Sequence, residues 1–236
     1  MSDLNKIIGS TKKSSNTIWM TTTDLMSGLM IVFMFIAISY MVFLDRKTEK
    51  TYEIVKEWDR SKQELVEALH NEFDSDLKEW SAEIDDDDIA IKFIAPEILF
   101  EPAKAFIKPQ FRIILNEFYP RYLKVLADYK EFIAEIRIEG HTSKEWKSKS
   151  NDEAYLLNME LSQDRSRSVL RYIVTQVGHK ISKDLSWAKK RITANGLSSS
   201  NLYIRKGTYY PKKSRRVEFK VRTNAEERIE LILAKR

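Results

Sequence analysis

Apolar residues dominate one stretch near the N-terminus. Residues 18–44 read IWMTTTDLMSGLMIVFMFIAISYMVFL, and the part from Leu25 to Leu44 carries no charge. Because a transmembrane helix needs about 20 apolar residues, this pattern predicts a membrane-spanning helix over 18–44, preceded by a short tail, 1–17. The run is too long for a signal peptide, and no small-residue cleavage site precedes the charged residues that follow it. We therefore expect an uncleaved anchor in a lipid bilayer.

A charged segment with apolar residues at helical spacing follows, over 45–88. The larger apolar residues recur mostly every three, four or seven positions: Tyr52, Val55, Trp58, Leu65, Leu69, Phe73, Leu77, Trp80 and Ile84. This pattern predicts an amphipathic helical linker that ends near Ile84. Since the stripe lacks a strict heptad, it fits either a linker paired in a dimer or a helix packed on its own domain.

Apolar residues at strand-like and at helix-like spacing both occur over 89–223. Alternating apolar residues predict strands near 89–93, 136–139, 191–195 and 215–222, and helical spacing predicts helices near 110–126 and 158–176. In the last strand Val217, Phe219 and Val221 alternate with charged residues, which suits a sheet with one covered face. The expected fold is α+β, a mixed β-sheet packed by helices. A C-terminal helix is expected at 224–236.

The residue types present restrict the possible chemistry. The chain has no cysteine, which excludes disulfides and thiolate metal sites. Its histidines are His70, His141 and His179, with no zinc-protease or phosphate-loop pattern around them. We therefore expect no enzyme activity, no cofactor and no metal site, with His141 in a turn. The four aspartates at 85–88 lack the alternation of a calcium loop and predict a solvated turn.

The net charge is positive, +5, with many basic residues at 205–222. Such a cluster can attract nucleic acid, an anionic cell wall or lipid headgroups. No nucleic-acid-binding motif accompanies it, so we expect no direct contact with nucleic acid.

Asp24 is the one charged residue within the apolar stretch. A carboxylate at the centre of a bilayer costs about 3 kcal/mol, so ionisable residues there usually face a partner helix or an aqueous path. On a helix, Thr21, Asp24, Ser27 and Gly28 share one face, and small or hydroxylated residues favour helix packing. Asp24 is therefore predicted to be an ion site. The alternative is a helix cap or a headgroup position near the start of the span.

The residues around Asp24 carry a resemblance. Trp19, then Asp24-Leu25-Met26-Ser27, then Leu29-Met30 and an apolar run resemble the single membrane helix of MotB-type stator subunits, the ion-driven motor proteins of the flagellum. The resemblance implies that Asp24 accepts and releases the translocated ion, which would be a proton. Sodium stays an alternative because neighbouring hydroxyls could coordinate it. The resemblance also implies a homodimer within a ring of MotA-like A subunits.

A second resemblance covers about 89–223. Ile136-x-Ile138-x-Gly140-His141-Thr142, Asn158-x-x-Leu161-Ser162-x-x-Arg165, Gly196 and Arg215-Arg216-Val217-Glu218 resemble the OmpA-like peptidoglycan-binding domain. This family match implies a peptidoglycan site at Thr142, Ser143, Asn158, Leu161, Arg165 and Arg216.

The chemistry of that site follows from its residue types. The guanidinium of Arg165 suits a stem-peptide carboxylate. The usual pattern has an aspartate for the diaminopimelate ammonium where this chain has Ser143. Because a serine hydroxyl is neutral, Glu145 or Asp152 could supply the missing charge.

Two systems share this arrangement of membrane carboxylate, linker and OmpA-like domain: the flagellar stator and the Zorya anti-phage defence system. Gly140-His141-Thr142-Ser143 followed by Glu145-Trp146, together with the compact length, look more like the Zorya B subunits, whose partner is a ring of ZorA-like A subunits. The expected function is therefore the B subunit of an ion-driven motor anchored to peptidoglycan. A flagellar stator subunit or a static wall anchor without transport are the alternatives.

Orientation rests on the same resemblance, which implies an inner-membrane protein with a cytoplasmic N-terminus and a periplasmic C-terminal domain. More lysine and arginine residues follow the span than precede it, which taken alone favours the opposite orientation. Long translocated domains can override that bias, and we follow the resemblance.

Overall fold

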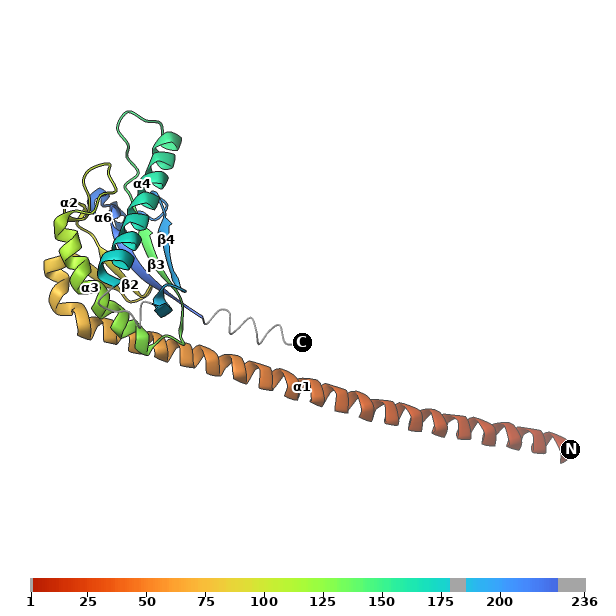
Figure 1. Ribbon diagram of the computed structural model, residues 1–236. Coiled ribbons are helices and arrows are strands. Elements are labelled where there is room, and N and C mark those ends of the chain that lie inside the picture. The colour runs from red at the N-terminus through yellow and green to blue at the C-terminus, as the bar shows by residue number, and fades with distance from the viewer. Residues whose placement is uncertain (1, 179–185, 225–236) are drawn as a thin grey trace. The chain divides into compact units, whose positions relative to one another are not determined.

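The computed structural model describes residues 2–178 and 186–224 (Figure 1). The chain divides into two compact units, Met1–Glu53 and Ile54–Arg236, which are described separately. Helix α1, Ser2–Trp80, contributes to both. The expected C-terminal helix at 224–236 lies almost entirely outside the described residues.

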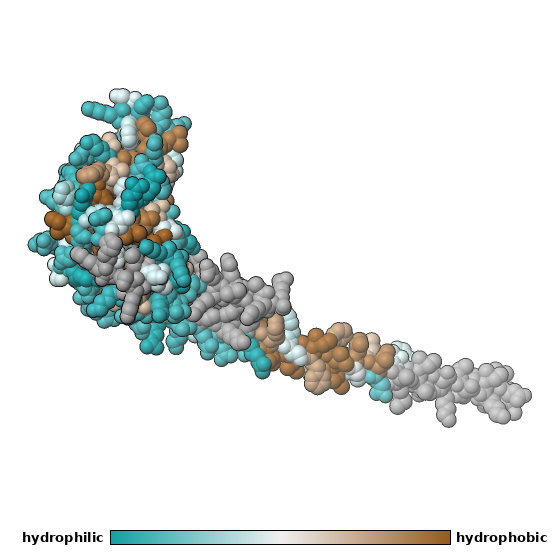
Figure 2. Space-filling model, viewed as in Figure 1, coloured by the Kyte–Doolittle hydropathy of each residue, from teal (hydrophilic) through white to brown (hydrophobic). Residues whose placement is uncertain are grey.

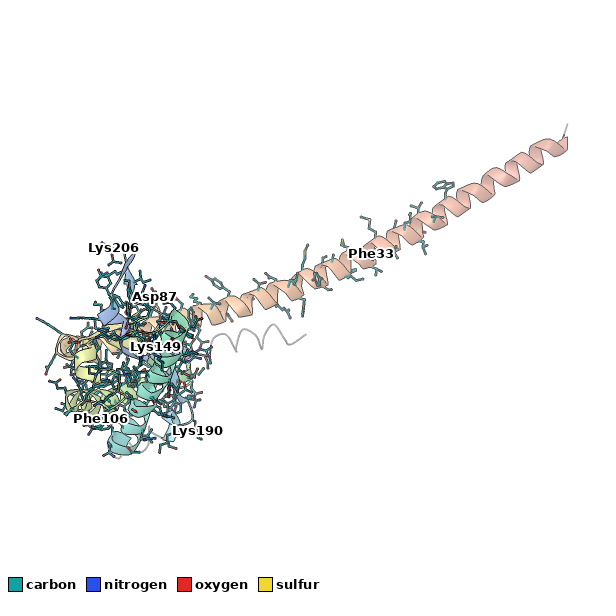
Figure 3. All side chains as sticks on the ribbon, turned by 90° about the horizontal axis from the view of Figure 1, so that it is seen from above. Phe33, Asp87, Phe106, Lys149, Lys190 and Lys206 are labelled. Carbon is teal, nitrogen blue, oxygen red and sulfur yellow. The ribbon has the colours of Figure 1, made fainter. Side chains whose placement is uncertain are left out.

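The first unit contains the apolar part of α1. Thr22–Arg46 is the one stretch in the described chain that is long and apolar enough to cross a membrane, and none of it is buried. Figure 2 shows this part of the helix as a hydrophobic band, and Figure 3 shows Phe33 projecting clear of the helix. A helix that is apolar on all sides suits lipid. The span expected at 18–44 thus has its counterpart in the structure.

In the second unit, the end of α1 packs on its own domain. Leu65, Leu69 and Phe73 are fully buried in the domain core, and Trp80 is nearly so. Of the two interpretations of the stripe, packing on its own domain is therefore the correct one for this part of the helix.

The expected end of the helix at Ile84 is wrong. The helix stops at Trp80, Ser81 takes a positive φ of 50°, and strand β1, Ala82–Asp85, begins. Ile84 pairs with Ile91 of β2 across a hairpin. The Asp85 carboxylate accepts the backbone N–H groups of Asp87 and Asp88, so the aspartate run forms the turn of this hairpin.

A mixed five-stranded sheet forms the centre of the domain, in the order β1-β2-β7-β3-β4. Its strands are β1, β2 (Ala90–Phe93), β7 (Val217–Thr223), β3 (Ile133–Gly140) and β4 (Ile192–Gly196). Only β3 and β4 pair in parallel, while the other neighbours are antiparallel. A small hairpin of β5, Ile204–Arg205, and β6, Thr208–Tyr209, stands apart. The expected α+β fold with a mixed sheet is confirmed.

The helices of the domain are α2 (Pro96–Leu99), α3 (Pro109–Asp128), α4 (Asn151–Tyr172) with a π-helical continuation (Ile173–Val177), and α6 (Pro211–Ser214). Helix α4 begins seven residues before the expected start at Asn158. Ser150 and Glu153 form a reciprocal capping box at its N-terminus, which fixes the start there. The loop between β3 and α4 is therefore shorter than a helix that begins at Asn158 would leave it.

Aromatic packing joins the sheet to the helices. Phe118 of α3 lies 5.2 Å from Phe93 of β2 and 5.0 Å from Phe219 of β7, measured between ring centroids. The same ring lies 5.3 Å from Phe73 of α1. Each fully buried ring of this size contributes about 1.5–3 kcal/mol. The end of α1 is therefore an integral part of this core.

Candidate functional site

A cleft of about 1000 Å³ opens where β3 ends beside α2, α4 and α6. Five of the six residues expected to bind peptidoglycan line it: Thr142, Ser143, Asn158, Leu161 and Arg165. These residues come from two separate parts of the chain, the turn after β3 and one face of α4. The cleft is therefore the candidate functional site.

Glycines allow α4 to approach the sheet closely enough to form the cleft. A Cβ on Gly140 of β3 would lie 2.4 Å from the Ser162 carbonyl oxygen, and one on Gly196 of β4 would lie 2.3 Å from the Gln163 backbone nitrogen. Any side chain at either position would push the helix away. On α4, Asn158, Leu161 and Arg165 follow one another at intervals of three and four residues, so their side chains share one face of the helix.

Hydrogen bonds fix the turn that follows β3. The Asn158 Nδ2 amide donates to the Ser143 carbonyl oxygen at 3.0 Å, and the Thr142 backbone N–H donates to the Ser198 carbonyl oxygen at 2.8 Å. The Thr142 hydroxyl is buried and has no hydrogen-bond partner among the described residues. Buried polar groups are normally paired, so this hydroxyl is available to a ligand.

Arg165 holds the opposite wall of the cleft. Its guanidinium donates to the Lys104 and Glu101 carbonyl oxygens at 3.0 and 3.3 Å and lies 4.9 Å from the Phe100 ring centroid. Burial, together with the charge of Arg215, lowers the pKa of Arg165 to about 10, so the side chain stays charged at neutral pH. Arg165 therefore joins α4 to the 101–104 loop and adds positive charge to the cleft.

The cleft is lined by charges of both signs. Its basic residues are Lys108, Lys147, Arg165, Lys212 and Arg215, and its acidic residues are Glu97, Glu101 and Glu145. Glu145, one of the two expected substitutes for the missing aspartate, lies here and accepts a hydrogen bond from the Tyr209 hydroxyl at 3.1 Å. Asp152, the other expected substitute, lies in the first turn of α4 and does not line the cleft. Such a surface suits a zwitterionic ligand.

Arg216 is not part of the cleft, contrary to expectation. Side chains alternate along a strand, and Val217 and Phe219 face the helix-covered core, so Arg216 points to the other side of the sheet. It contacts the Glu218 carboxylate and donates to the Asn201 carbonyl oxygen at 3.0 Å. The adjacent Arg215 lines the cleft instead. Phe100, Trp146 and Lys212 also line it and were not expected.

The second candidate site is Asp24 in the apolar part of α1. Asp24, Ser27 and Gly28 are all exposed on α1, and nothing lies within 4 Å of a Cβ placed on Gly28. The side chain of Thr21 lies outside the described part of the chain. The face that contains Asp24 is therefore open for packing against another helix.

Comparisons with known proteins agree with this fold. The OmpA family model matches residues 99–215. Zorya protein ZorB from Escherichia coli (strain Crooks) is 43% identical over 235 residues, which are 98% of this chain and 99% of that protein.

Solved structures also match. They include a MotB-like protein from Desulfovibrio vulgaris, with 22% identity, a TM-score of 0.48 and coverage of 73% of this chain and 98% of that one. The cell wall anchor of the T6SS from Pseudomonas aeruginosa matches with 19% identity, a TM-score of 0.44 and coverage of 66% and 96%. By its identity to the Escherichia coli protein along nearly the whole length of both chains, the protein belongs to the ZorB family of Zorya proteins.

Proposed function

We propose that the protein is the B subunit of an ion-driven motor in Zorya anti-phage defence. In this proposal two copies sit within a ring of ZorA-like A subunits in the inner membrane. The C-terminal domains bind peptidoglycan in the periplasm and hold the dimer still while the ring turns. The observation that carries the proposal is the lone carboxylate of Asp24 on an exposed apolar helix in a chain that also has a charged ligand cleft.

The cleft supports the wall-binding half of the proposal. Peptidoglycan stem peptides present carboxylates and, in diaminopimelate, an ammonium group. The basic side chains around Arg165 suit the carboxylates, Glu145 suits the ammonium, and the unpaired Thr142 hydroxyl can bond either a carbonyl or an amide. The overall positive charge of the protein also favours an anionic wall over long distances.

Asp24 supports the motor half. It would take up an ion from one side of the membrane and release it to the other as the A subunits move past. One elementary charge crossing 100 mV supplies about 2.3 kcal/mol, which is enough to drive a conformational step. We propose a proton as the ion, with sodium as the alternative.

Replacing Asp24 by Asn tests the motor directly. We expect Asp24→Asn to remove protection against phage in cells that carry the complete system, because the amide cannot carry a charge across the membrane. The variant should still co-purify with the A subunit and bind peptidoglycan. Asp45→Asn, the same change on the same helix beyond the uncharged run, is the matched control and should protect fully.

The alternatives predict different results. A static wall anchor would protect equally well with Asn at position 24, and that outcome would refute the motor. A flagellar stator subunit would restore swimming to a stator-deficient strain, whereas we expect no restoration.

A further inference from the structure

Three ionisable side chains are buried together on the side of the sheet that faces away from α3 and α4. Glu139 belongs to β3, His141 follows the end of β3, and Glu218 belongs to β7. The exposed fractions of these side chains are 7%, 1% and 3%, respectively. None of them lines the cleft. We call this group the Glu-His-Glu cluster.

The strand register forces the two carboxylates together. Glu139 and Glu218 are direct partners in the antiparallel pairing of β3 with β7. Like charges directly opposite each other destabilise a sheet, and burial strengthens their repulsion because the local dielectric is low. A buried pair of this kind requires positive charge between or beside the two carboxylates.

The imidazole of His141 faces both carboxylates at ion-pair distance but forms no hydrogen bond with either. Its Nε2 atom lies 3.6 Å from Glu139 Oε2 and 3.6 Å from Glu218 Oε1, beyond hydrogen-bond range. Neither ring nitrogen has a hydrogen-bond partner among the described residues. A buried imidazole without a hydrogen bond at either nitrogen is uncommon, so its Nε2 atom can accept a ligand between the two carboxylates.

The spacing of the three ligand atoms fits a metal ion. One carboxylate oxygen from each glutamate and one ring nitrogen lie within 4.8 Å of one another. In tetrahedral coordination at about 2.1 Å, two ligand atoms lie about 3.4 Å apart, close to the 3.6 Å between Nε2 and each oxygen. Calcium prefers six to eight oxygen ligands, whereas one imidazole with two carboxylates suits zinc.

Two arginines pair with the carboxylates. Arg137 Nη1 lies 3.8 Å from Glu139 Oε1, so the other oxygen of Glu139 is the one that faces His141. Arg216 contacts Glu218 Oε1, the oxygen that also lies 3.6 Å from His141 Nε2. The carbonyl oxygen of Arg216 accepts the His141 backbone N–H at 3.0 Å. Hydrogen bonds of this kind to ligating carboxylates are usual around metal ions because they fix the ligand geometry.

We propose that the Glu-His-Glu cluster binds one zinc ion, with water at a fourth position. This site could not be expected from sequence, because Glu139-x-His141 alone is a weak pattern and Glu218 lies far away in the chain. The ion would add positive charge between β3 and β7 to that of Arg137 and Arg216. It would also fix the turn after β3, where Thr142 and Ser143 begin the wall of the cleft.

Metal content and affinity of the full chain test the proposal. The protein would be purified in detergent without a polyhistidine tag, stripped with a chelator, loaded with zinc and desalted before elemental analysis. We expect about one zinc per chain. Titration with zinc should show at least a tenfold weaker affinity in Glu139→Gln and His141→Asn than in the wild type.

Two matched variants control for other zinc sites. Glu135→Gln removes a carboxylate from the same strand and the same side of the sheet, where it bonds Thr193 and Arg137 rather than His141. His70→Asn removes the imidazole that bonds Asp74 and Asp86 nearer the surface. Both should keep wild-type affinity. Zinc lost only from His70→Asn, or not bound by the wild type at all, would overturn the proposal.

Cobalt provides a test that needs no variant. If the cluster variants fail to fold, the visible spectrum of the wild-type protein loaded with Co²⁺ decides. Intense bands of tetrahedral cobalt that disappear on addition of about one equivalent of zinc support the site. A spectrum of hydrated, octahedral cobalt refutes it. No peptidoglycan is present in these measurements, so the result is independent of the proposed function.

Discussion

Two stretches of helix α1 are rich in large apolar residues, but these side chains are exposed in one stretch and buried in the other. In Thr22–Arg46 these side chains are exposed on every side, and Phe33 is 60% exposed. Near the end of the helix the apolar residues form one stripe, and Phe73 at its centre is completely buried. One continuous helix thus combines a surface suited to lipid with a surface that is part of a protein core.

The two environments therefore differ in how much of the helix circumference is apolar, more than in the length of the apolar stretch. Charged residues such as Glu72 and Asp76 interrupt the second stretch, and both pair with Arg121 of α3. In the first stretch Asp24 is the one charged residue before Asp45, and it is exposed on the helix surface. A carboxylate in such a place needs a partner from another chain.

The largest expected difference is between the same truncation of an aromatic side chain in the two stretches. Phe73→Ala should lower the free energy of unfolding of the domain by about 3–5 kcal/mol, because the cavity would remove contacts with Trp80 and Phe118. Phe33→Ala should leave it unchanged. Chemical denaturation of the full chain in detergent, followed by tryptophan fluorescence, measures both. Equal effects of the two changes would contradict the division of α1 described above.

Much of the fold could be predicted from periodicity. The strand at Val217, Phe219 and Val221 was predictable because each second residue is apolar. Strand β1 was missed since Ile84 continues the helical spacing from Trp80, and only its pairing with Ile91 makes it a strand. The start of α4 was missed because its first residues, Asn151, Asp152 and Glu153, are polar and exposed, although the capping box at Ser150 and Glu153 was present in the sequence.

The candidate site was predictable only in part. Thr142, Asn158 and Arg165 came from motif resemblance, and the structure brings them together. Arg216 lies outside the cleft because side chains alternate along a strand, which turns Arg215 toward the cleft instead. Lys212 and Phe100 could not be found from sequence because tertiary packing of distant elements brings them to the site. The same holds for Glu218 beside His141.

A smaller effect is expected in the cleft, where Arg165 can be compared with Arg167 on the same helix. Arg165→Ala should weaken binding of the full chain to purified peptidoglycan about tenfold or more, because one charge-assisted hydrogen bond contributes about 1.5–3 kcal/mol. Arg167 lies on the surface, paired with Asp164, and Arg167→Ala should bind normally. Sedimentation with intact sacculi measures both. Equal binding by the two variants would exclude Arg165 from the ligand site.

The smallest expected effect concerns His70, which connects the second stretch of α1 to the β1–β2 turn. Its Nδ1 atom lies 2.7 Å from Asp74 and its Nε2 atom 2.9 Å from Asp86. Hydrogen bonding to Asp86 raises the pKa of His70, against the opposing effect of partial burial, and Asp74 adds to the increase. The folded protein therefore binds this proton more tightly than the unfolded chain does.

The sign of the pH dependence follows from this difference. The stabilisation is complete below the unfolded pKa of about 6.5 and disappears as pH rises through the higher folded value. Because the side chain is 35% exposed, the contribution should stay below about 1 kcal/mol. Denaturation midpoints of the wild type and His70→Gln should therefore differ at pH 5.5 and converge at pH 9. A difference that persists at pH 9 would mean that His70 stabilises the turn by packing and not by its charge.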